Sequence, residues 1–280
     1  FCILIGWNFS QGFLHEFCES TFILIYIIDN VSYDSIWIKA NKNITRSLVS
    51  QLKTIQDIYI NNKNNLYFPV DVSNYKDINQ IKIILKQQQN LPDVVINNAA
   101  GNFLCPFHKL SENGWKRIID IVLNGSFNIY HIFGKEFISI KKPATFLNIS
   151  TTYSETSSAL VIPSAVAKAG VDNLMKGLTV EWSKYGMRFV GIAPGPMADT
   201  GGAEKLDKMG LFKLYNSVNN PSKRMCKTEE IANLALYLTS EKADYINGEI
   251  IKIDGGEFIK NQGEFSFISN IPYHDYMLKK

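Results

Sequence analysis

Short apolar runs alternate with amphipathic stretches of helical length along most of this chain, and this alternation limits the possible folds more than any other feature. The apolar runs lie at Tyr67–Val70, Val94–Asn97, Ala144–Ile149, Arg188–Ala193 and Glu249–Ile253. The amphipathic stretches lie at Tyr75–Gln89, Glu112–Ser139, Ser164–Tyr185 and Thr228–Ser240. Strands that alternate with helices form βαβ crossovers, which produce a parallel sheet with helices on both faces. We therefore predict an α/β fold with a doubly wound parallel sheet.

The length and composition fit one domain and argue against several kinds of function. The chain has 280 residues without an internal repeat, so we expect a single domain over residues 1–280. A net charge of +3, with lysines scattered among acids, is too small to indicate nucleic-acid binding. The four cysteines are far apart and the four histidines do not cluster with carboxylates, so we expect neither disulfides nor a metal. The apolar run Phe22–Ile28 is too short to span a bilayer and suits a buried strand.

The stretch Ser164–Tyr185 has the clearest helix signals. Pro163 and Ser164 are typical of a helix start, and Gly186 is typical of a helix end. Apolar residues recur at helical spacing, at Val171, Leu174, Leu178 and Trp182. These four side chains therefore belong to the core or to a subunit interface.

A tyrosine and a lysine lie on either side of the start of this helix. Tyr153 precedes the helix and Lys168 lies within it. A cation beside a phenol favours phenolate, so the pKa of the phenol can fall from about 10 toward neutrality. Such a pair suits the reduction of a carbonyl or an enone, where an acid must hold the developing oxyanion. The alternative is a surface tyrosine with a solvated lysine, and the rest of the chain argues against it.

The spacing between Tyr153 and Lys168 limits the reactions that this pair can catalyse. The residue one helical turn before Lys168 is Ser164, whose hydroxyl is too weak an acid for this role. A loop tyrosine followed by Ser-x-x-x-Lys at a helix start resembles the short-chain dehydrogenase/reductase family, and within it the mitochondrial type of 2,4-dienoyl-CoA reductase. An ordinary Tyr-x-x-x-Lys would have favoured a reductase of ketones or alcohols, which stays as an alternative function.

Small and polar residues follow the predicted strands, where a doubly wound sheet binds its ligand. Asn97 and Asn98 can tie adjacent strand ends together, and the small Ala99 lets a cofactor approach the backbone. N-N-A-A-G-N-F, at Asn97–Phe103, resembles a signature of the family in the form typical of the dienoyl-CoA reductases. Two further motifs resemble the family's nicotinamide-side loop and its terminal D-G-G, at Pro194–Met197 and Asp254–Gly256.

The resemblance implies a Rossmann-like domain that binds a dinucleotide. Asp71 would hold the adenine, and Asn124 would support a water and proton relay to Lys168. The other contacts with the cofactor that the resemblance implies are Asn98, Ala99, Lys168, Pro194, Gly195, Pro196 and Met197.

The amino-terminal part of the chain matches the family less closely. Residues 93–268 resemble the family closely and residues 1–92 only loosely. The phosphate-binding loop corresponds to I-G-W-N-F-S-Q-G, with Gly6 and Gly12 in place and Ser10 where the middle glycine belongs. Trp7 and Phe9 add bulk to a loop that should lie against pyrophosphate. A non-catalytic family member with an impaired cofactor loop is therefore a second alternative.

Two segments compete for the second strand, and they favour different cofactors. Ile36–Lys42 resembles a second strand with a basic exit, where Lys39 and Lys42 would bind the 2′-phosphate of NADPH as point charges. If Phe22–Ile28 forms this strand instead, Asp29 would accept ribose hydroxyls and favour NADH. We expect NADPH, with NADH as the alternative.

The resemblance implies NADPH-dependent reduction of 2,4-dienoyl-CoA to 3-enoyl-CoA, a step in the β-oxidation of unsaturated fatty acids. Tyr153 and Asn102 would hydrogen-bond the thioester oxygen, and the resulting dienolate would be protonated at carbon 2. Lys168 would bind the nicotinamide ribose and lower the pKa of the phenol. Ser164 would orient the nicotinamide amide.

The expected partner is an acyl-CoA substrate. Phe103 would pack against the acyl chain, and Ser111 and Lys205 would touch CoA, although each also suits a structural or solvated role. Ser73 stands where relatives carry an arginine, which puts part of CoA binding in doubt. The resemblance also implies a homotetramer in the mitochondrial matrix. No targeting segment is visible in this chain, and Leu278–Lys280 is not a peroxisomal signal.

Overall fold

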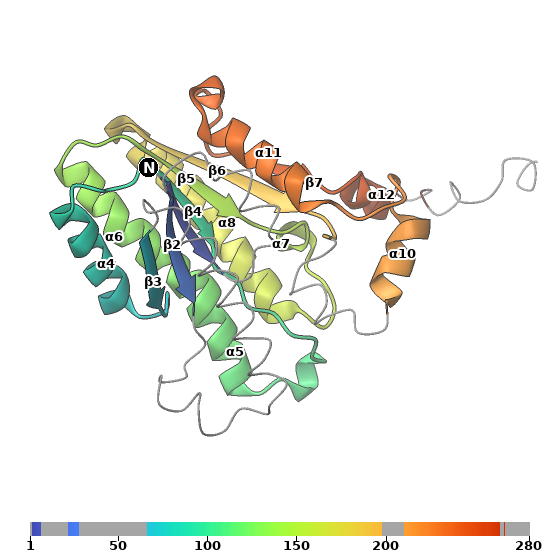
Figure 1. The fold of residues 1–280 in the computed structure, drawn as a ribbon. Coiled ribbons are helices and arrows are strands. Elements are labelled where there is room, and N and C mark those ends of the chain that lie inside the picture. The colour runs from blue at the N-terminus through green and yellow to red at the C-terminus, as the bar shows by residue number, and fades with distance from the viewer. Residues whose placement is uncertain (1, 7–21, 28–65, 198–209, 264–265, 267–280) are drawn as a thin grey trace, which may run out of the picture.

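Within the described residues, seven parallel strands form one sheet (Figure 1). The computed structural model describes residues 2–6, 22–27, 66–197, 210–263 and 266. The strands are β1 (Cys2–Gly6), β2 (Phe22–Ile27), β3 (Leu66–Val70), β4 (Val94–Asn98), β5 (Ala144–Ile149), β6 (Met187–Pro194) and β7 (Ile250–Ile253). Their order is β3-β2-β1-β4-β5-β6-β7, and every neighbouring pair is parallel. The order reverses between β1 and β4, which confirms a doubly wound sheet.

Helices of the described segments lie between these strands along the chain, and one more follows the last strand. They are α4 (Tyr75–Gln87), α5 (Glu112–Ile119), α6 (Gly125–Ser139), α7 (Tyr153–Thr156), α8 (Ile162–Trp182), α10 (Leu211–Asn219), α11 (Thr228–Thr239) and α12 (Glu257–Gln262). Short 3₁₀ turns lie at η1 (Phe107–Lys109), η3 (Ser183–Tyr185) and η4 (Glu241–Ala243), and η2 (Asp120–Asn124) is a π-helical turn. The long helices agree with the predicted stretches apart from small shifts at their ends and the interruption at η2.

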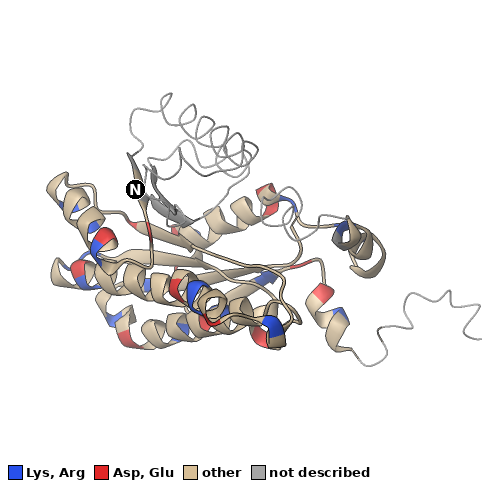
Figure 2. Cartoon of the chain, turned by 90° about the horizontal axis from the view of Figure 1, so that it is seen from below, with Lys and Arg blue, Asp and Glu red and all other residues tan. Residues whose placement is uncertain are grey.

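Charges of both signs are mixed on these helices (Figure 2). Lys86 of α4, for example, pairs with Glu136 of α6 at 2.6 Å. No helix in the described ranges is long and apolar enough to cross a membrane. The same residues contain no group of three His, Cys, Asp or Glu side chains that could hold a metal ion.

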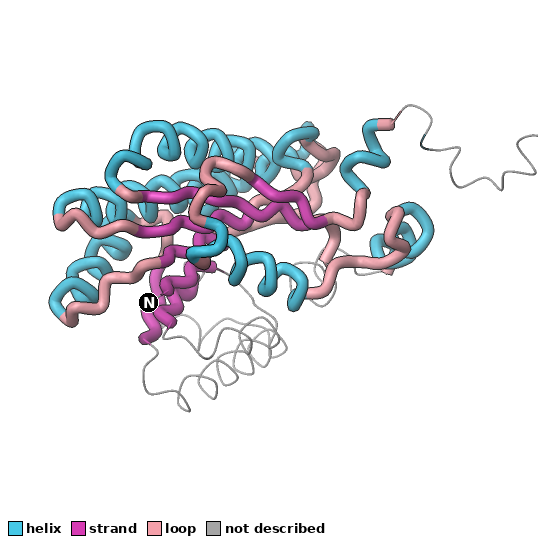
Figure 3. Tube along the Cα trace, turned by 90° about the horizontal axis from the view of Figure 1, so that it is seen from above, coloured by secondary structure: helices cyan, strands magenta, loops and turns pink. Residues whose placement is uncertain are grey.

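Helices cover both faces of the sheet (Figure 3). The core on the side of α4, α6 and α8 includes Val95, Phe146 and Phe189. The next residue along each of these strands belongs to the core on the side of α11, namely Ile96, Leu147 and Val190. Successive side chains of a strand point to opposite faces, so the central strands are buried on both sides. This explains why their sequences are continuous apolar runs.

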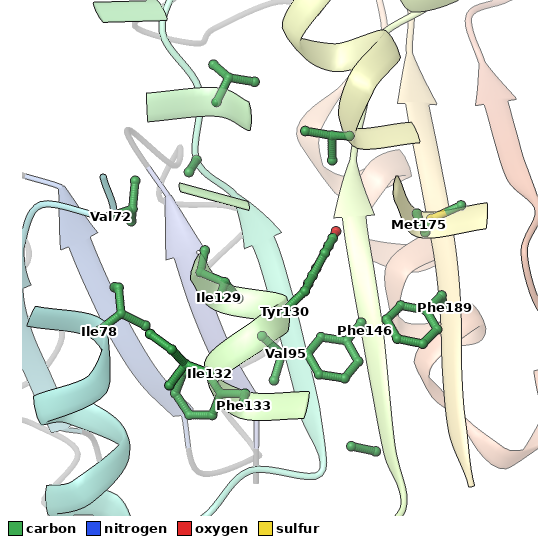
Figure 4. Close-up of a cluster of buried hydrophobic side chains, with 14 of the residues drawn as sticks. Val72, Ile78, Val95, Ile129, Tyr130, Ile132, Phe133, Phe146, Met175 and Phe189 are labelled. Carbon is green, nitrogen blue, oxygen red and sulfur yellow. The ribbon is translucent and has the colours of Figure 1, made fainter. Parts of the chain in front are cut away.

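Aromatic rings fill the larger core (Figure 4). Phe146 and Phe189 stack with their centroids 5.0 Å apart, and Tyr130 of α6 meets Phe146 edge-on at 5.5 Å. Complete burial raises the pKa of Tyr130 above its ordinary value. The apolar residues predicted for α8 also belong to this core: Val171, Leu174, Leu178 and Trp182.

The second strand of the sheet is β2, so the preferred placement at Ile36–Lys42 is wrong. β2 pairs with β1 on one side and β3 on the other, which is the place that Ile36–Lys42 was expected to take. The alternative run Phe22–Ile28 matches β2 to within one residue. An inner strand of a parallel sheet suits a continuous apolar run, and F-I-L-I-Y-I is such a run. I-W-I-K-A-N-K contains two lysines.

The helix predicted over Glu112–Ser139 is divided by the π-helical turn η2. Directly after this turn, a Cβ atom on Gly125 would lie only 2.6 Å from Cγ2 of Val72. The chain therefore needs glycine where α6 meets the segment after β3. A π turn leaves the apolar pattern of a long helix nearly intact, so this interruption could not be predicted from the pattern of residues.

Two loops at the carboxyl ends of β6 and β7 pack against each other. A Cβ atom on Gly195 would lie 2.7 Å from Cβ of Asp254, so a side chain does not fit there. The Asp254 carboxylate accepts hydrogen bonds from the backbone N–H groups of Gly256 at 2.9 Å and Phe258 at 2.7 Å. The φ angle of Gly256 is +87°, a conformation that favours glycine. The P-G-P-M and D-G-G motifs thus form one packed unit.

Candidate active site

The side chain of Tyr153 lies beside two other polar side chains, which come from two other segments of the chain. Its Oη accepts a hydrogen bond from Asn102 Nδ2 at 3.2 Å and lies 3.3 Å from Ser164 Oγ. Asn102 comes from the loop after β4 and Ser164 from the first turn of α8. Tyr153 was expected in a loop, but it is the first residue of the four-residue helix α7. The structure brings together three of the predicted catalytic residues.

Lys168 lies one turn after Ser164 on α8 and is buried, with 4% of its surface exposed. Its Nζ donates a hydrogen bond to the backbone oxygen of Ile149, the last residue of β5. Burial lowers the pKa of Lys168 to about 8, and the nearby Asp172 carboxylate acts in the opposite direction. The buried ammonium is therefore held at the carboxyl end of the sheet and can lose its proton under mild conditions.

A buried chain of polar side chains lies beneath Lys168, and the sequence predicted only part of it. Asn97 Nδ2 donates to Asn148 Oδ1 at 3.3 Å, which ties β4 to β5 as expected for Asn97. The unexpected members continue the chain: Asn148 Nδ2 donates to Asp172 Oδ1 at 3.1 Å, and Ser150 Oγ donates to Asp172 Oδ2 at 2.6 Å. The available signal was the spacing of Asp172 four residues after Lys168, on the same face of the helix.

The expected cofactor residues begin at the point where the strand order reverses. Gly6 ends β1 and lies beside Asn98, the last residue of β4. Ala99 follows and is buried. Doubly wound sheets bind dinucleotides at this crevice, so the small residues present here fit such a ligand. Four other predicted site residues lie outside the described residues: Ser10, Gly12, Lys42 and Lys205.

Two predicted residues have their side chains engaged locally. The Asp71 carboxylate accepts hydrogen bonds from the backbone N–H and the hydroxyl of Ser73, at 2.9 and 2.7 Å. Asn124 lies at the end of η2, and its Nδ2 donates to Asp120 Oδ1 at 2.7 Å. No hydrogen bond among the described residues joins the Asn124 side chain to Lys168.

The loop Pro194–Met197 is anchored by backbone contacts. The N–H of Gly195 donates to the carbonyl of Ile253 at 3.0 Å, and the N–H of Cys226 donates to the carbonyl of Pro196 at 2.8 Å. Met197 forms an isolated parallel bridge with Cys226. Pro194, the last residue of β6, is buried. The segment Pro194–Met197 therefore has a fixed position at the carboxyl end of the sheet, where the residues predicted to bind the cofactor lie.

Apolar side chains lie in the loops beside Tyr153. The N–H of Cys105 donates to the carbonyl of Leu160 at 2.8 Å, which joins the loop after β4 to the loop after α7. Four large apolar residues of these loops and of the adjoining turn η1 are exposed: Phe103, Leu104, Phe107 and Leu160. Only Phe103 was singled out in the sequence, although the apolar run F-L-C-P-F was visible there. Ser111 caps α5, because its Oγ accepts the N–H of Gly114 at 3.0 Å.

Comparison with known proteins connects this geometry to a family. A family model described as enoyl-(acyl carrier protein) reductase matches residues 43–257. A "Probable 2,4-dienoyl-CoA reductase [(2E)-enoyl-CoA-producing]" of Bacillus subtilis (strain 168) is 49% identical over 170 residues, which are 60% of this chain and 66% of that protein. A "Probable 2,4-dienoyl-CoA reductase decr-1.2 [(3E)-enoyl-CoA-producing]" of Caenorhabditis elegans is 40% identical over 175 residues, 62% and 57% of the two chains. The chain thus spans between 57% and 66% of the length of these relatives.

A solved structure agrees with the whole fold. The crystal structure of a short chain dehydrogenase from Bacillus anthracis str. 'Ames Ancestor' superimposes with a TM-score of 0.76 at 35% identity, over 91% of this chain and 95% of that chain. The family model covers well over half of the chain. The doubly wound sheet, with Lys168 at the carboxyl ends of its strands, agrees with the match to this family. The chain therefore belongs to the short-chain dehydrogenase/reductase family, in the group described as enoyl-(acyl carrier protein) reductases.

Proposed function

We propose that this protein reduces 2,4-dienoyl-CoA thioesters to 3-enoyl-CoA, in the β-oxidation of unsaturated fatty acids. The observation that carries the proposal is the position of Tyr153, whose hydroxyl lies between Asn102 and Ser164 in a chain with no tyrosine one turn before Lys168. The two relatives described above, named for dienoyl-CoA reduction, support the same substrate class.

The hydrogen bonds around Tyr153 suit an acid that meets a thioester oxygen. Because Tyr153 Oη accepts a hydrogen bond from Asn102, its own proton is available for the oxygen of a substrate. Asn102 has a second N–H that can point to the same oxygen. Negative charge gathers on this oxygen as the diene is reduced, and the two donors stabilise it. Protonation of the resulting dienolate at carbon 2 gives the 3-enoyl product.

A reduced nicotinamide dinucleotide, when bound, supplies the hydride for the far end of the diene. Lys168 would hold the nicotinamide ribose, and Ser164 would orient the nicotinamide amide. The backbone around Asn98, Ala99 and Pro194–Met197 would contact the rest of the dinucleotide. Asp71 would lie at its adenine and Gly6 at its phosphates. Asn124 would act in the proton relay through a water.

The electron donor in this proposal is NADPH, on the resemblance to the reductases alone, because Lys39 and Lys42 do not stand at the exit of β2, which ends at Ile27. NADH is the second candidate, and one observation favours it. β2 ends at Ile27, so Asp29 comes two residues after the strand, where an acidic residue accepts ribose hydroxyls of NADH. Parallel titrations with the two dinucleotides distinguish these candidates, and tighter binding of NADH would reject NADPH.

The acyl chain of the substrate would lie against Phe103 and its apolar neighbours beside Tyr153. Ser111 and Lys205 would contact the CoA portion. We place the protein in the mitochondrial matrix as a homotetramer, as the resemblance implies. Organelle fractionation and light scattering test these two statements, and a peroxisomal location or a stable monomer would reject them.

The direct test of the function is turnover of 2,4-hexadienoyl-CoA, followed by the loss of NADPH absorbance and by identification of the product. The proposal predicts 3-enoyl-CoA, whereas 2-enoyl-CoA is the product named for the B. subtilis relative. A dinucleotide-binding titration accompanies the assay. Binding without turnover would mean a different substrate, such as a ketone or an alcohol. Failure to bind either dinucleotide would mean a non-catalytic family member.

A further inference from the structure

Asp172 is a buried carboxylate to which the proposed reaction gives no role. Only 6% of its surface is exposed, and it lies four residues after Lys168 on α8, on the same face of the helix. Lys168 is equally well buried. A buried charge is costly unless an opposite charge and hydrogen bonds compensate it, and the Asp172 carboxylate provides an opposite charge that favours the ammonium form of Lys168.

Two hydrogen bonds connect Asp172 to the group that holds Lys168. Ser150 Oγ donates to one carboxylate oxygen at 2.6 Å, and Asn148 Nδ2 donates to the other at 3.1 Å. Ser150 directly follows Ile149, whose carbonyl receives the Lys168 ammonium. The carboxylate therefore fixes the peptide on which the ammonium rests, in addition to attracting it electrostatically.

The Asp172 carboxylate is held by a series of hydrogen bonds between buried side chains of several elements. Asn148 accepts a hydrogen bond from Asn97, and Asn97 also donates to Ser126 Oγ of α6 at 2.8 Å. All of these side chains are buried. Asp172 is thus tied to β4, β5 and α6, and it cannot turn away from Lys168 without breaking this series of hydrogen bonds.

Several charged and titratable groups on the elements packed against α8 have partners elsewhere. Asp120 of η2 accepts from Asn124, Arg117 of α5 pairs with Asp71, Glu155 of α7 pairs with Lys252, and Arg188 of β6 donates to the carbonyl of Leu238. Tyr153 of α7 and Tyr130 of α6 are bonded to Asn102 and Asn97. Among the described residues, Asp172 is the charge that acts on Lys168.

We propose that Asp172 is a positioning residue, held by Ser150 and Asn148, that keeps Lys168 protonated and directed toward the end of β5. The effect of Asp172 on Lys168 does not depend on the proposed function. Only its consequence for catalysis does, because that requires Lys168 to take part in the reaction. Removal of the carboxylate should favour the neutral amine, because burial then acts without the opposing charge.

The test is the titration of Lys168 in the folded chain, observed by NMR of lysine labelled at the ε-carbon and assigned through Lys168→Arg. The unchanged chain should give a midpoint at about 8. In Asp172→Asn the midpoint should fall by about one pH unit, as for the loss of a near opposite charge. The matched control is Asp244→Asn, which removes an exposed carboxylate and should leave the midpoint in place. An unchanged midpoint in Asp172→Asn would overturn the proposal.

Two additional readouts separate this proposal from a purely structural role and from the proposed function. If Asp172 only supports the fold, its loss lowers the melting temperature without moving the midpoint. If Asp172→Asn does not fold, Asp172→Ser provides the same test, because it also removes the charge and places a smaller polar side chain at this position. In an active enzyme, the alkaline limb of kcat/KM should move down together with the midpoint. A shifted midpoint in a chain that does not reduce dienoyl-CoA would reject the function and retain the role of Asp172.

Discussion

Burial controls the chemistry of Lys168. Its ammonium is almost completely removed from solvent, and burial lowers its pKa from 10.5 to about 8. One pKa unit corresponds to about 1.4 kcal/mol, so this difference corresponds to roughly 3 kcal/mol of disfavoured charge. Lys168 is therefore protonated at neutral pH, but its pKa lies close enough to neutrality for the loss of the proton to be followed by titration.

We predict that dinucleotide affinity falls as the pH rises through about 8. Above this pKa Lys168 loses its proton, and a neutral amine binds ribose oxygens less strongly than an ammonium does. Fluorescence titrations from about pH 6 to about pH 10 measure the change, with Lys168→Met as the pH-insensitive control. The same dissociation constant at both ends of this range in the unchanged chain would contradict the prediction.

Gly195→Ala should destabilise the protein by about 1–3 kcal/mol, because the added methyl group overlaps Asp254 and forces the backbone apart. Urea unfolding measures the loss. The matched control is Gly177→Ala on α8, where no atom lies within 4 Å of the new Cβ. This control should stabilise the chain by up to about 1 kcal/mol, since alanine favours helix. Equal effects at the two positions would argue against the close contact at Gly195.

The residues proposed for catalysis could be predicted from their spacing together with the family resemblance, whereas the buried residues that support them could not. Tyr153, Ser164 and Lys168 stand at distinctive intervals, and the structure brings Tyr153 and Ser164 within 3.3 Å. Asp172 has the spacing of an ordinary surface charge on a helix. Its burial depends on how α8 packs on the sheet, and this is a tertiary property that local sequence does not specify.

At the scale of elements, α7 determines where Tyr153 lies. This helix has four residues, too few to be stable by themselves. Glu155 of α7 pairs with Lys252 of β7 at 2.6 Å, and the Lys252 ammonium lies 4.3 Å from the centre of the Phe258 ring. The ion pair thus ties α7 to the carboxyl end of β7.

Lys252→Met should lower kcat several-fold while it changes stability by less than about 1 kcal/mol, as expected for a partly exposed ion pair. The looser α7 places Tyr153 less accurately, but dinucleotide affinity should stay the same because α7 is not a cofactor segment. Lys142→Met is the control, since it breaks a comparable pair with Asp93 at the opposite end of the strands. A Lys252→Met variant with unchanged kcat would mean that α7 keeps its position without this tie.

Long periodic elements were predictable, and short or competing ones were not. Ala144–Ile149 was predicted with the observed bounds because its apolar run is flanked by clear breaks. The short helices α7, α10 and α12 offer too few turns for a periodic signal. The second strand was misplaced because two apolar runs fit one position, and pairing with β1 and β3 decided between them.

At the scale of the whole molecule, the parallel sheet gathers the proposed site at one edge. Gly6, Asn98 and Ile149 end three different strands, and Pro194 ends a fourth. Parallel strands direct their carboxyl ends to the same edge, so residues far apart in sequence meet there. A ligand that binds across this edge connects several strands and should stabilise the complete fold.

Saturating NADPH should therefore raise the melting temperature of the protein. A ligand at 100 times its dissociation constant stabilises the folded state by about 2.7 kcal/mol. Differential scanning calorimetry at matched concentrations of NADPH and NADH measures the effect, with free CoA as a comparison. A larger shift with NADH would change the assigned coenzyme, and no shift with either dinucleotide would contradict a cofactor site at this edge.

The central claim is that Tyr153 is the acid of the reaction, and Tyr153→Phe tests it most directly. The measurement is single-turnover reduction of 2,4-hexadienoyl-CoA, beside a dinucleotide titration, in Tyr153→Phe and in a control variant. The control is Tyr185→Phe, which changes a half-exposed tyrosine of η3, the turn that follows α8. We predict a loss of at least about a hundredfold in the rate for Tyr153→Phe, with dinucleotide affinity unchanged and the control fully active. Turnover at the normal rate without the Tyr153 hydroxyl would contradict the account.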